Sequence, residues 1–458
     1  MHKAIIPLLY VLIFSVSNLF AGNGSKPHYN DKDINHIVSQ LTLEQKARLL
    51  VGCPGSDKGV SHIVAGSAGY TFPIDSLGIP SINLADGPVG VRITPVLPNK
   101  PYTSYCTCFP STTALAATWN KDIARLEGNA IGDEALAYGV DIVLTPGINI
   151  MRNPLCGRNF EYFSEDPYLS GIMGAAIIIG IQDKGIRASL KHFIANNQQT
   201  GKLYNDARIS QRAIREIYLK GFEICIKNSD PWTVMGSYNK IGGQYTQANP
   251  ELLRTILRNE WNYNGLIVTD WYKKRDTADQ LNGGTDLMMP GEQSQVDEII
   301  AGVKNGRISE TTLNKSVKYV LKLISKSISN KGWEYNEAPD LAANAALARR
   351  IATEGMVLLK NDRSFLPISQ GAKIALFGAT AYKSIAGGTG SSNVNKAHIT
   401  DISTGLEKGG YTLSNRLKGL YTKFVEFQND LLDKHPESTD WEKLSYNRTV
   451  IAEMDLSK

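Results

Sequence analysis

The 458-residue sequence lacks the features that mark several common classes of protein. After residue 20, no run of residues is long and apolar enough to span a bilayer. The net charge is only +5, and the Lys and Arg residues are scattered rather than grouped in blocks or interleaved with aromatic residues. These absences argue against nucleic acid as a partner and against a stable membrane span in the mature protein.

Motifs for cofactors and metals are also missing. The chain has no Gly-x-x-x-x-Gly-Lys-Ser/Thr phosphate loop and no Gly-x-Ser-x-Gly elbow. The segment 387–393 has Asn393 where a dinucleotide fingerprint needs its third glycine, which leaves a nucleotide-binding oxidoreductase as a weak alternative. Cys106 and Cys108 have no second Cys or His pair at ligand spacing, and the five cysteines allow at most two disulfides. We therefore expect no metal and no cofactor.

The amino terminus has the order of a secretory signal. A basic start, Met1-His-Lys3, is followed by an apolar run over residues 4–20 and by a small residue, Ala21. This order predicts a signal peptide over residues 1–21 and export to the periplasm or the medium. A retained membrane anchor is the alternative, but Ser15, Ser17 and Asn18 interrupt the apolar run.

Short apolar segments that end in polar residues alternate with helical stretches over much of the chain. We expect strands at residues 81–85, 141–145, 186–190, 233–236, 266–269 and 285–288. We expect helices at residues 46–50, after a capping-box pattern at 42–45, and at 111–137, 211–227 and 250–261. This alternation indicates a parallel sheet. The best fit is an α/β fold with a (β/α)₈-type, TIM-like barrel, and an open doubly wound sheet is the alternative.

The predicted barrel is followed by a second region of different composition. We expect the barrel domain over residues 22–335, a linker with a helix at 341–359 over residues 336–372, and a partial α/β sandwich domain over residues 373–458. A buried strand at 373–377 would open that second domain. About 85 residues are fewer than most independent domains of this kind contain, so we expect the second domain to be incomplete.

Polar residues gather at the predicted strand ends, and in a barrel these ends share one mouth. They are Asp86, Arg152, Lys191, His192, Tyr238, Asp270 and Trp271. Carboxylates, cations, a phenol and an indole together suit the hydroxyl groups and the apolar ring face of a sugar. Nearby positive charge would keep Asp270 ionised, as the nucleophile of a glycosidase requires. The alternative is that Asp270 only caps the next helix.

Several motifs resemble glycoside hydrolase family 3, the β-glucosidase and β-xylosidase group. They are DGPVGVR at 86–92, MRNPLCGRNFEYFSED at 151–166, KHF at 191–193 with NNQ at 196–198, REIY at 215–218, MGSYN at 235–239 and TDW at 269–271. With LLKN at 358–361 and the loop at 387–394, the resemblance covers residues 41 to about 413. It implies an amino-terminal barrel, a following α/β sandwich domain and a retaining mechanism without a cofactor.

The resemblance also implies a role for each matching residue. Asp270 would be the nucleophile, with Tyr238 near it and Trp271 against the sugar ring. The residues that grip the hydroxyls of the non-reducing sugar would be Asp86, Arg152, Lys191 and His192. The supporting ion pairs would come from Arg158, Glu161, Glu165 and Glu216.

Two departures from the family pattern refine the expected function. Residues 194–198 replace the His-bearing loop of members that act on N-acetylglucosaminides, which favours the β-glucosidase-like branch. The general acid/base of that branch is a Glu of the second domain, and no stretch up to Lys458 resembles its motif, as in a chain truncated within that domain. We therefore expect a secreted, retaining exo-β-glucosidase that acts on small β-glycosides. A β-xylosidase and a sugar-binding fragment without the acid/base are the alternatives.

Overall fold

The computed structural model describes residues 31–55, 64–94, 103–271, 275–388 and 390–434. The predicted signal peptide at residues 1–21 lies outside these ranges. No helix within them is both long enough and apolar enough to cross a membrane.

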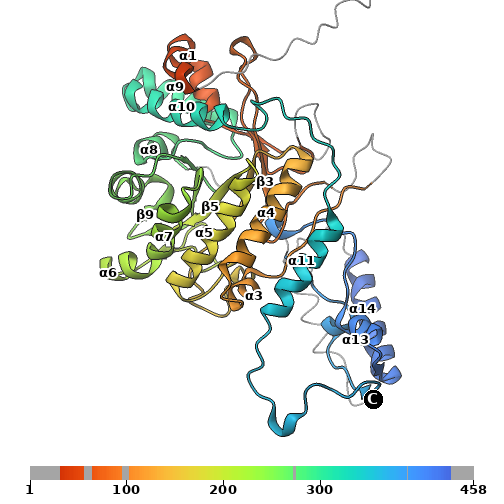
Figure 1. The fold of residues 1–458 in the computed structure, drawn as a ribbon. Coiled ribbons are helices and arrows are strands. Elements are labelled where there is room, and N and C mark those ends of the chain that lie inside the picture. Colours follow the sequence, from red (N-terminus) through yellow and green to blue (C-terminus); the bar gives the residue numbers. More distant parts are fainter. Residues whose placement is uncertain (1–30, 56–63, 95–102, 272–274, 389, 435–458) are drawn as a thin grey trace, which may run out of the picture.

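The centre of the molecule is a curled, seven-stranded sheet (Figure 1). Its order is β1 (Cys53–Pro54), β2 (Gly69–Tyr70), β3 (Asn83–Asp86), β4 (Ile142–Leu144), β5 (Arg187–Phe193), β7 (Thr233–Gly236) and β10 (Leu266–Val268). The pairs from β3 to β10 are parallel, whereas β2 is antiparallel to both of its neighbours. The predicted α/β fold with a TIM-like barrel is therefore confirmed, but its first strands form antiparallel pairs instead of βα units.

Two isolated bridges connect the edges of this sheet. Val268 at the end of β10 pairs with Leu287, and Met288 pairs with Val51, just before β1. The amide of Gly52 donates to the carbonyl of Met288 at 2.8 Å. The strand predicted at 285–288 is therefore present only as these two bridges. They link β10 to the segment just before β1.

Helices cover the outside of the sheet (Figure 1). The long ones are α4 (Lys121–Tyr138), α5 (Pro167–Asp183), α7 (Lys220–Ser229), α9 (Gln293–Lys304) and α10 (Glu310–Ser325). The shorter ones include α1 (Ile34–Gln40), α2 (Leu43–Leu49), α3 (Thr112–Ala117), α6 (Gln211–Ala213) and α8 (Thr277–Gly283), and two stretches are π-helical, Ile214–Tyr218 and Glu251–Glu260. The predicted capping box is present at α2, where Thr42 and Gln45 exchange side-chain-to-backbone hydrogen bonds.

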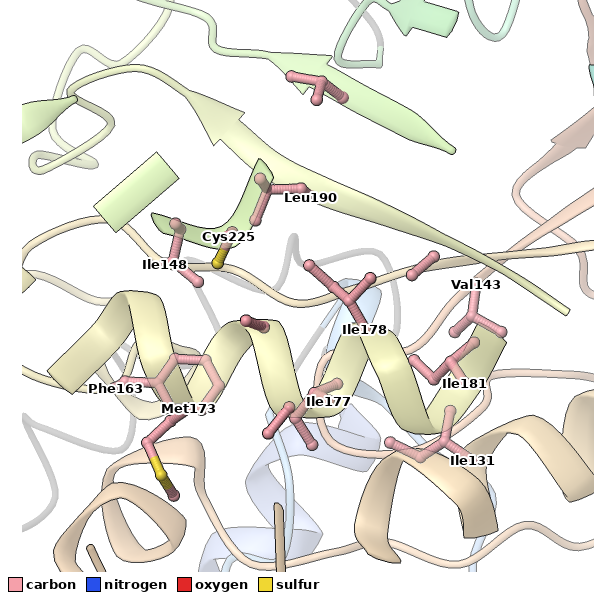
Figure 2. Packing of buried hydrophobic residues seen from close by; sticks show 14 of the residues in the cluster. Ile131, Val143, Ile148, Phe163, Met173, Ile177, Ile178, Ile181, Leu190 and Cys225 are labelled. Carbon is pink, nitrogen blue, oxygen red and sulfur yellow. The ribbon is translucent and has the colours of Figure 1, made fainter. Parts of the chain in front are cut away.

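Helix α5 illustrates how the outer helices pack against the sheet. Ile178 and Ile181 are fully buried, and they lie with Val143 of β4, Leu190 of β5 and Ile131 of α4 in one apolar cluster (Figure 2). A helix that is apolar on nearly all sides in this way belongs in an interior. Burial of each such side chain stabilises the fold by roughly 1.5–3 kcal/mol, so α5 holds β4 and β5 firmly in place.

The chain after the barrel contains α11 (Leu341–Glu354), β11 (Lys373–Ile374), α12 (Ala379–Tyr382), α13 (Ile402–Lys408), β12 (Thr412–Leu413) and α14 (Asn415–Lys434). Helix α11 packs on α3 and α4, and α13 and α14 lie further from the barrel (Figure 1). The helix predicted at 341–359 ends at Glu354, and the predicted buried strand at 373–377 is wrong: β11 has two residues and Phe377 is 69% exposed. A buried parallel strand needs covering layers on both faces of its sheet, whereas β11 pairs only with β12 in the described part of the chain and the following Phe377 is exposed.

Candidate active site

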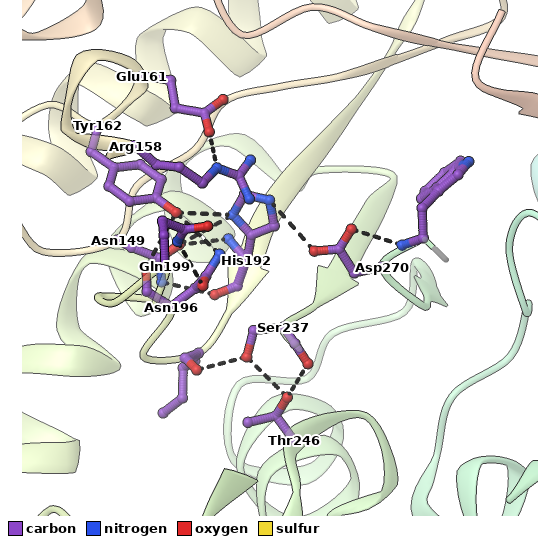
Figure 3. A network of polar contacts seen from close by, with 12 residues as sticks. Asn149, Arg158, Glu161, Tyr162, His192, Asn196, Gln199, Ser237, Thr246 and Asp270 are labelled. Carbon is purple, nitrogen blue, oxygen red and sulfur yellow. Dashed lines mark hydrogen bonds and ion pairs between the residues drawn. The ribbon is translucent and has the colours of Figure 1, made fainter. Parts of the chain in front are cut away.

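Asp270 lies just beyond the carboxyl end of β10, where the buried strand meets the barrel mouth. Its Oδ1 atom accepts a hydrogen bond from the amide of Trp271 at 2.7 Å. Its Oδ2 atom is buried, has no hydrogen-bond partner of ordinary geometry among the described residues, and lies 3.7 Å from His192 Nε2 (Figure 3). Asp276, not Asp270, caps the following helix α8, so the capping alternative for Asp270 is wrong.

Burial raises the pKa of the Asp270 carboxyl, and the positive charge of Arg158, the amide of Trp271, the charge of Lys191 and a hydrogen bond from the Tyr238 side chain oppose this effect, so Tyr238 lies next to Asp270 as predicted. The pKa stays above its ordinary value, because burial outweighs the nearby positive charge that the sequence analysis expected to favour the ionised form. This carboxylate, once ionised, is therefore more basic than one in water. A basic carboxylate with an oxygen that accepts no hydrogen bond of ordinary geometry from the described residues is a competent nucleophile.

His192 lies within β5 and is held by a side-chain amide. Asn149 Oδ1 accepts the backbone amide of His192 at 3.0 Å, and Asn149 Nδ2 donates to its carbonyl at 2.9 Å (Figure 3). Burial lowers the pKa of His192 well below its usual range, and the charges of Arg158 and Lys191 lower it further. The imidazole is therefore neutral near pH 7, and its contact with Asp270 is not an ion pair.

Arg158 and Glu161 pair directly through Nε and Oε1 on the loop between β4 and α5 (Figure 3). Burial acts to lower the pKa of Arg158, but the nearby Glu161 raises it above the ordinary value. The guanidinium therefore stays charged beside Asp270. This placement agrees with the predicted ion-pair role of Arg158 and Glu161 and also gives Arg158 a direct electrostatic effect on Asp270.

Asp86 and Lys191 form the other side of the site. Burial lowers the pKa of Lys191, and the charges of Glu161 and Asp86 oppose that effect. Burial likewise raises the pKa of Asp86, against the charges of Lys191 and Arg92. Arg92 Nη1 donates to Asp86 Oδ2 at 3.4 Å. Buried Lys191 and the partly buried Asp86 and Arg92 offer both donors and acceptors to a ligand that has several hydroxyls.

Three of the predicted site residues are not brought to this cluster. Arg152 is exposed and donates to the hydroxyl of Tyr218 at 3.2 Å, Glu165 is exposed, and Glu216 pairs with Arg212 on the molecular surface at 3.0 Å. Both Arg152 and Arg158 lie on the long loop after β4. The strand pattern could not show which arginine points inward, because an irregular loop has no side-chain period.

The indole of Trp271 is buried and donates to the carbonyl of Ala68 at 2.9 Å. This contact fixes the ring beside Asp270 and connects the end of β10 to the segment before β2. The predicted contact of Trp271 with a sugar ring stays a prediction.

The sequence patterns missed Lys202, which approaches the site from the loop after β5. Its Nζ atom lies 4.8 Å from the centre of the Tyr238 ring. Burial and Arg158 lower the pKa of Lys202, and the charge of Asp270 acts in the opposite direction. Asn149, which holds His192, was missed as well. Asn149 lies four residues beyond the predicted strand at 141–145, and this position at a strand end could have identified it as a site residue.

The segment after β11 also reaches the barrel. Val394 is buried in the barrel core, and the amide of Cys106 donates to the carbonyl of Asn395 at 2.8 Å. Gly388 packs so closely on the ring of Phe160 that a Cβ atom there would lie 2.5 Å from it. The glycine-rich loop therefore packs on the barrel as a structural element.

Within the described ranges, no group of three or more His, Cys, Asp or Glu residues could hold a metal, and all five cysteines are free.

The fold and the site are those of an α/β-barrel protein whose strand ends carry an aspartate beside buried cations and a neutral imidazole, a combination suited to a polyhydroxylated ligand. Residues 101–323 match the glycosyl hydrolase family 3 N terminal domain. The chain belongs to glycoside hydrolase family 3 and to its β-glucosidase-like members.

Individual relatives agree with this assignment. The chain is 40% identical over 410 residues to thermostable beta-glucosidase B of Acetivibrio thermocellus, covering 88% of this chain and 51% of that protein. It is 37% identical over 390 residues to an exo-alpha-(1->6)-L-arabinopyranosidase of Bifidobacterium longum, covering 81% and 49%. The structure of beta-glucosidase 3B from Thermotoga neapolitana in complex with alpha-D-glucose superposes with a TM-score of 0.83 and 42% identity, covering 87% of this chain and 57% of that one. The chain thus spans about half the length of the curated relatives it matches.

Proposed function

We propose that this protein is an exported, retaining exo-β-glucosidase that removes terminal β-D-glucosyl residues through a covalent glycosyl-aspartate on Asp270. The observation that carries the proposal is the buried Oδ2 atom of Asp270, which has no hydrogen-bond partner of ordinary geometry among the described residues and lies beside charged Arg158 and neutral His192.

In this mechanism Oδ2 attacks the anomeric carbon of the sugar, and the bond from that carbon to the leaving-group oxygen breaks. The leaving oxygen takes a proton from a general acid that we assign to no residue of this chain. Water then cleaves the glycosyl-aspartate, returning the carboxylate and releasing the sugar with its original anomeric configuration. Lys191, His192 and Asp86 would hold the sugar hydroxyls during both steps.

Covalent trapping tests this proposal without needing turnover. A β-glucoside with fluorine at C2 and an activated leaving group forms the intermediate with little acid assistance and loses it slowly. Mass spectrometry should show one added fluoroglucosyl group on the peptide that contains Asp270, and the Asp270→Asn variant should remain unlabelled. Label on another residue, or label that persists in Asp270→Asn, would disprove the assignment.

A second candidate, a glycosidase for five-carbon sugars such as xylose, is favoured by the arabinopyranosidase among the relatives. Aryl β-glucosides, β-xylosides and α-L-arabinopyranosides with one common leaving group separate the candidates. A higher kcat/KM on the glucoside supports the first proposal, and a higher value on a pentoside supports the second. If every sugar bound but none was cleaved, the chain would be a sugar-binding fragment.

Export is part of the proposal because residues 1–21 have the charge and hydropathy order of a signal peptide. Amino-terminal sequencing of protein recovered from the periplasm or the medium should begin near residue 22. Recovery of the uncleaved chain from the cytoplasm alone would contradict export.

A further inference from the structure

A cavity of about 590 Å³ lies where the barrel meets the segment that follows the glycine-rich loop. Barrel residues 92–94 form one part of its lining, and residues 393–396 with His398 and Ile399 form another. Basic groups from both parts, Arg92, Lys396 and His398, line this cavity, and no carboxylate appears among its described lining residues. We call it the basic cavity.

The basic groups retain hydrogen-bonding capacity. The Lys396 ammonium has three donors and gives one hydrogen bond, to the carbonyl of Val394 at 3.0 Å. Arg92 has five donors, and its contact with Asp86 is long, at 3.4 Å. Cations that line one cavity repel each other, and an anion among them would relieve this repulsion. A guanidinium and an ammonium that line the same cavity can both donate to the oxygens of a carboxylate, sulfate or phosphate.

The position of the basic cavity connects it to the sugar site. Arg92 lines the cavity and also touches Asp86, which is coupled electrostatically to Lys191 in the site described above. A ligand held by Asp86 therefore has the cavity next to it, on the Arg92 side.

We propose that the basic cavity binds an anionic group carried by the sugar that Asp86 contacts, so that the preferred substrates are acidic β-glycosides. This inference rests on the proposed function and adds a substrate class to it. The chemistry required is an oxyanion, and a carboxylate, a sulfate ester or a phosphate ester could supply it.

Equilibrium binding to the full chain tests the inference and needs no catalysis. The ligands are glucose, glucuronate, glucose 6-sulfate and glucose 6-phosphate, measured by calorimetry at low salt. At least one acidic sugar should bind about tenfold more tightly than glucose, since electrostatic contacts of this kind reach that size. The advantage should shrink as ionic strength rises, because salt screens partly exposed charges. The acidic sugar with the largest advantage identifies the anionic group.

Lys396→Met should remove most of the advantage of the acidic sugar and leave glucose affinity unchanged. His398→Gln, at an exposed position, is a second variant with the same expected direction. Lys373→Met is the matched control, because Lys373 is an exposed lysine of β11 outside the cavity.

The other possible results contradict either the inference about the basic cavity alone or the proposed function as well. If glucose binds and no acidic sugar binds more tightly, the basic cavity does not recognise substrate, and the proposed function stands. An advantage that survives in both Lys396→Met and His398→Gln overturns the inference in the same way. If inorganic sulfate binds through Lys396 while the acidic sugars show no advantage, the cavity takes free anions only. If no sugar binds at all, the proposed function fails and the inference fails with it.

Discussion

The barrel and the segment after α11 use apolar side chains in opposite ways. In the barrel, Ile178 and Leu190 are fully buried between helix and sheet. After α11, the apolar side chains of Leu359 and Ile385 are 92% and 81% exposed. An apolar segment therefore becomes a buried strand only when neighbouring strands and a covering layer are supplied. An extended exposed apolar surface is typical of a region that contacts other protein.

The Asp270 cluster and the basic cavity differ in the same way as the regions that form them. The cluster around Asp270 is built on strand ends that a dense core holds fixed, which is the arrangement that precise chemistry needs. The basic cavity instead depends on where the later segment docks, through the contacts of Val394 and Asn395 with the barrel. We therefore expect changes in the barrel to have larger effects than changes in the later segment.

The largest effect is expected at the centre of the barrel site. Asp270→Asn should reduce kcat on an activated aryl β-glucoside by about 10³-fold or more, in line with the loss of a nucleophile in other enzymes. The matched control is Asp276→Asn, which keeps a good capping side chain on α8 and should retain activity. Steady-state kinetics measures both. Near-normal turnover by Asp270→Asn would show that Asp270 is not the nucleophile.

The next effect compares the two regions directly. Ile178→Ala should destabilise the barrel by about 2–5 kcal/mol, because a buried cavity remains where the side chain was. Phe377→Ala should change stability by less than about 0.5 kcal/mol, because its ring is already largely in water. Urea unfolding followed by tryptophan fluorescence gives both values. Equal losses would show that the later segment has a core of its own.

A pH effect is expected from Glu127, which is buried in α4. Burial raises the pKa of Glu127 from 4.5 to about 8. The folded protein therefore keeps a proton that the unfolded chain releases, so stability should fall as pH rises from 4.5 to 8, by up to about 1.4 kcal/mol per pH unit from this group.

In Glu127→Gln this contribution disappears, and the midpoint of thermal unfolding should fall less between pH 5 and 8 than in the parent protein. Glu407→Gln, at an exposed position of α13, should behave like the parent. If Glu127→Gln had the same pH slope as the parent, the pKa of Glu127 would not be raised.

The smallest effect on stability is expected at the exposed apolar side chains. The double variant Leu359→Ser and Ile385→Ser should change the free energy of unfolding by less than about 0.5 kcal/mol and should reduce self-association of the purified chain. Sedimentation velocity at increasing concentration measures this. A large loss of stability would mean that these side chains are buried in solution, and the contrast between the two regions would disappear.

Much of the barrel could be predicted because its strands are short, apolar and separated by helical repeats. The strand at 233–236 was placed at its observed ends, and those at 141–145 and 266–269 differ from theirs by a residue or less at each end. The two-residue strands β1 and β2 have no period to detect. We could predict that Asp86, Lys191 and His192 lie close together, because the carboxyl ends of parallel strands meet at one mouth of a barrel. The catalytic and binding roles of these residues stay predictions.

Local sequence patterns were enough to predict the barrel, the family and the position of Asp270 at a strand end, because a buried strand and its polar end have a local signature. The folded structure was needed to show that the charge of Arg158 instead of Arg152 acts on Asp270, that Lys202 lies at the site, and that the strand expected at 373–377 is mostly exposed. These outcomes depend on how loops fold back and on which neighbours a segment finds. Contacts between residues far apart in the chain determine both, and no local pattern records them.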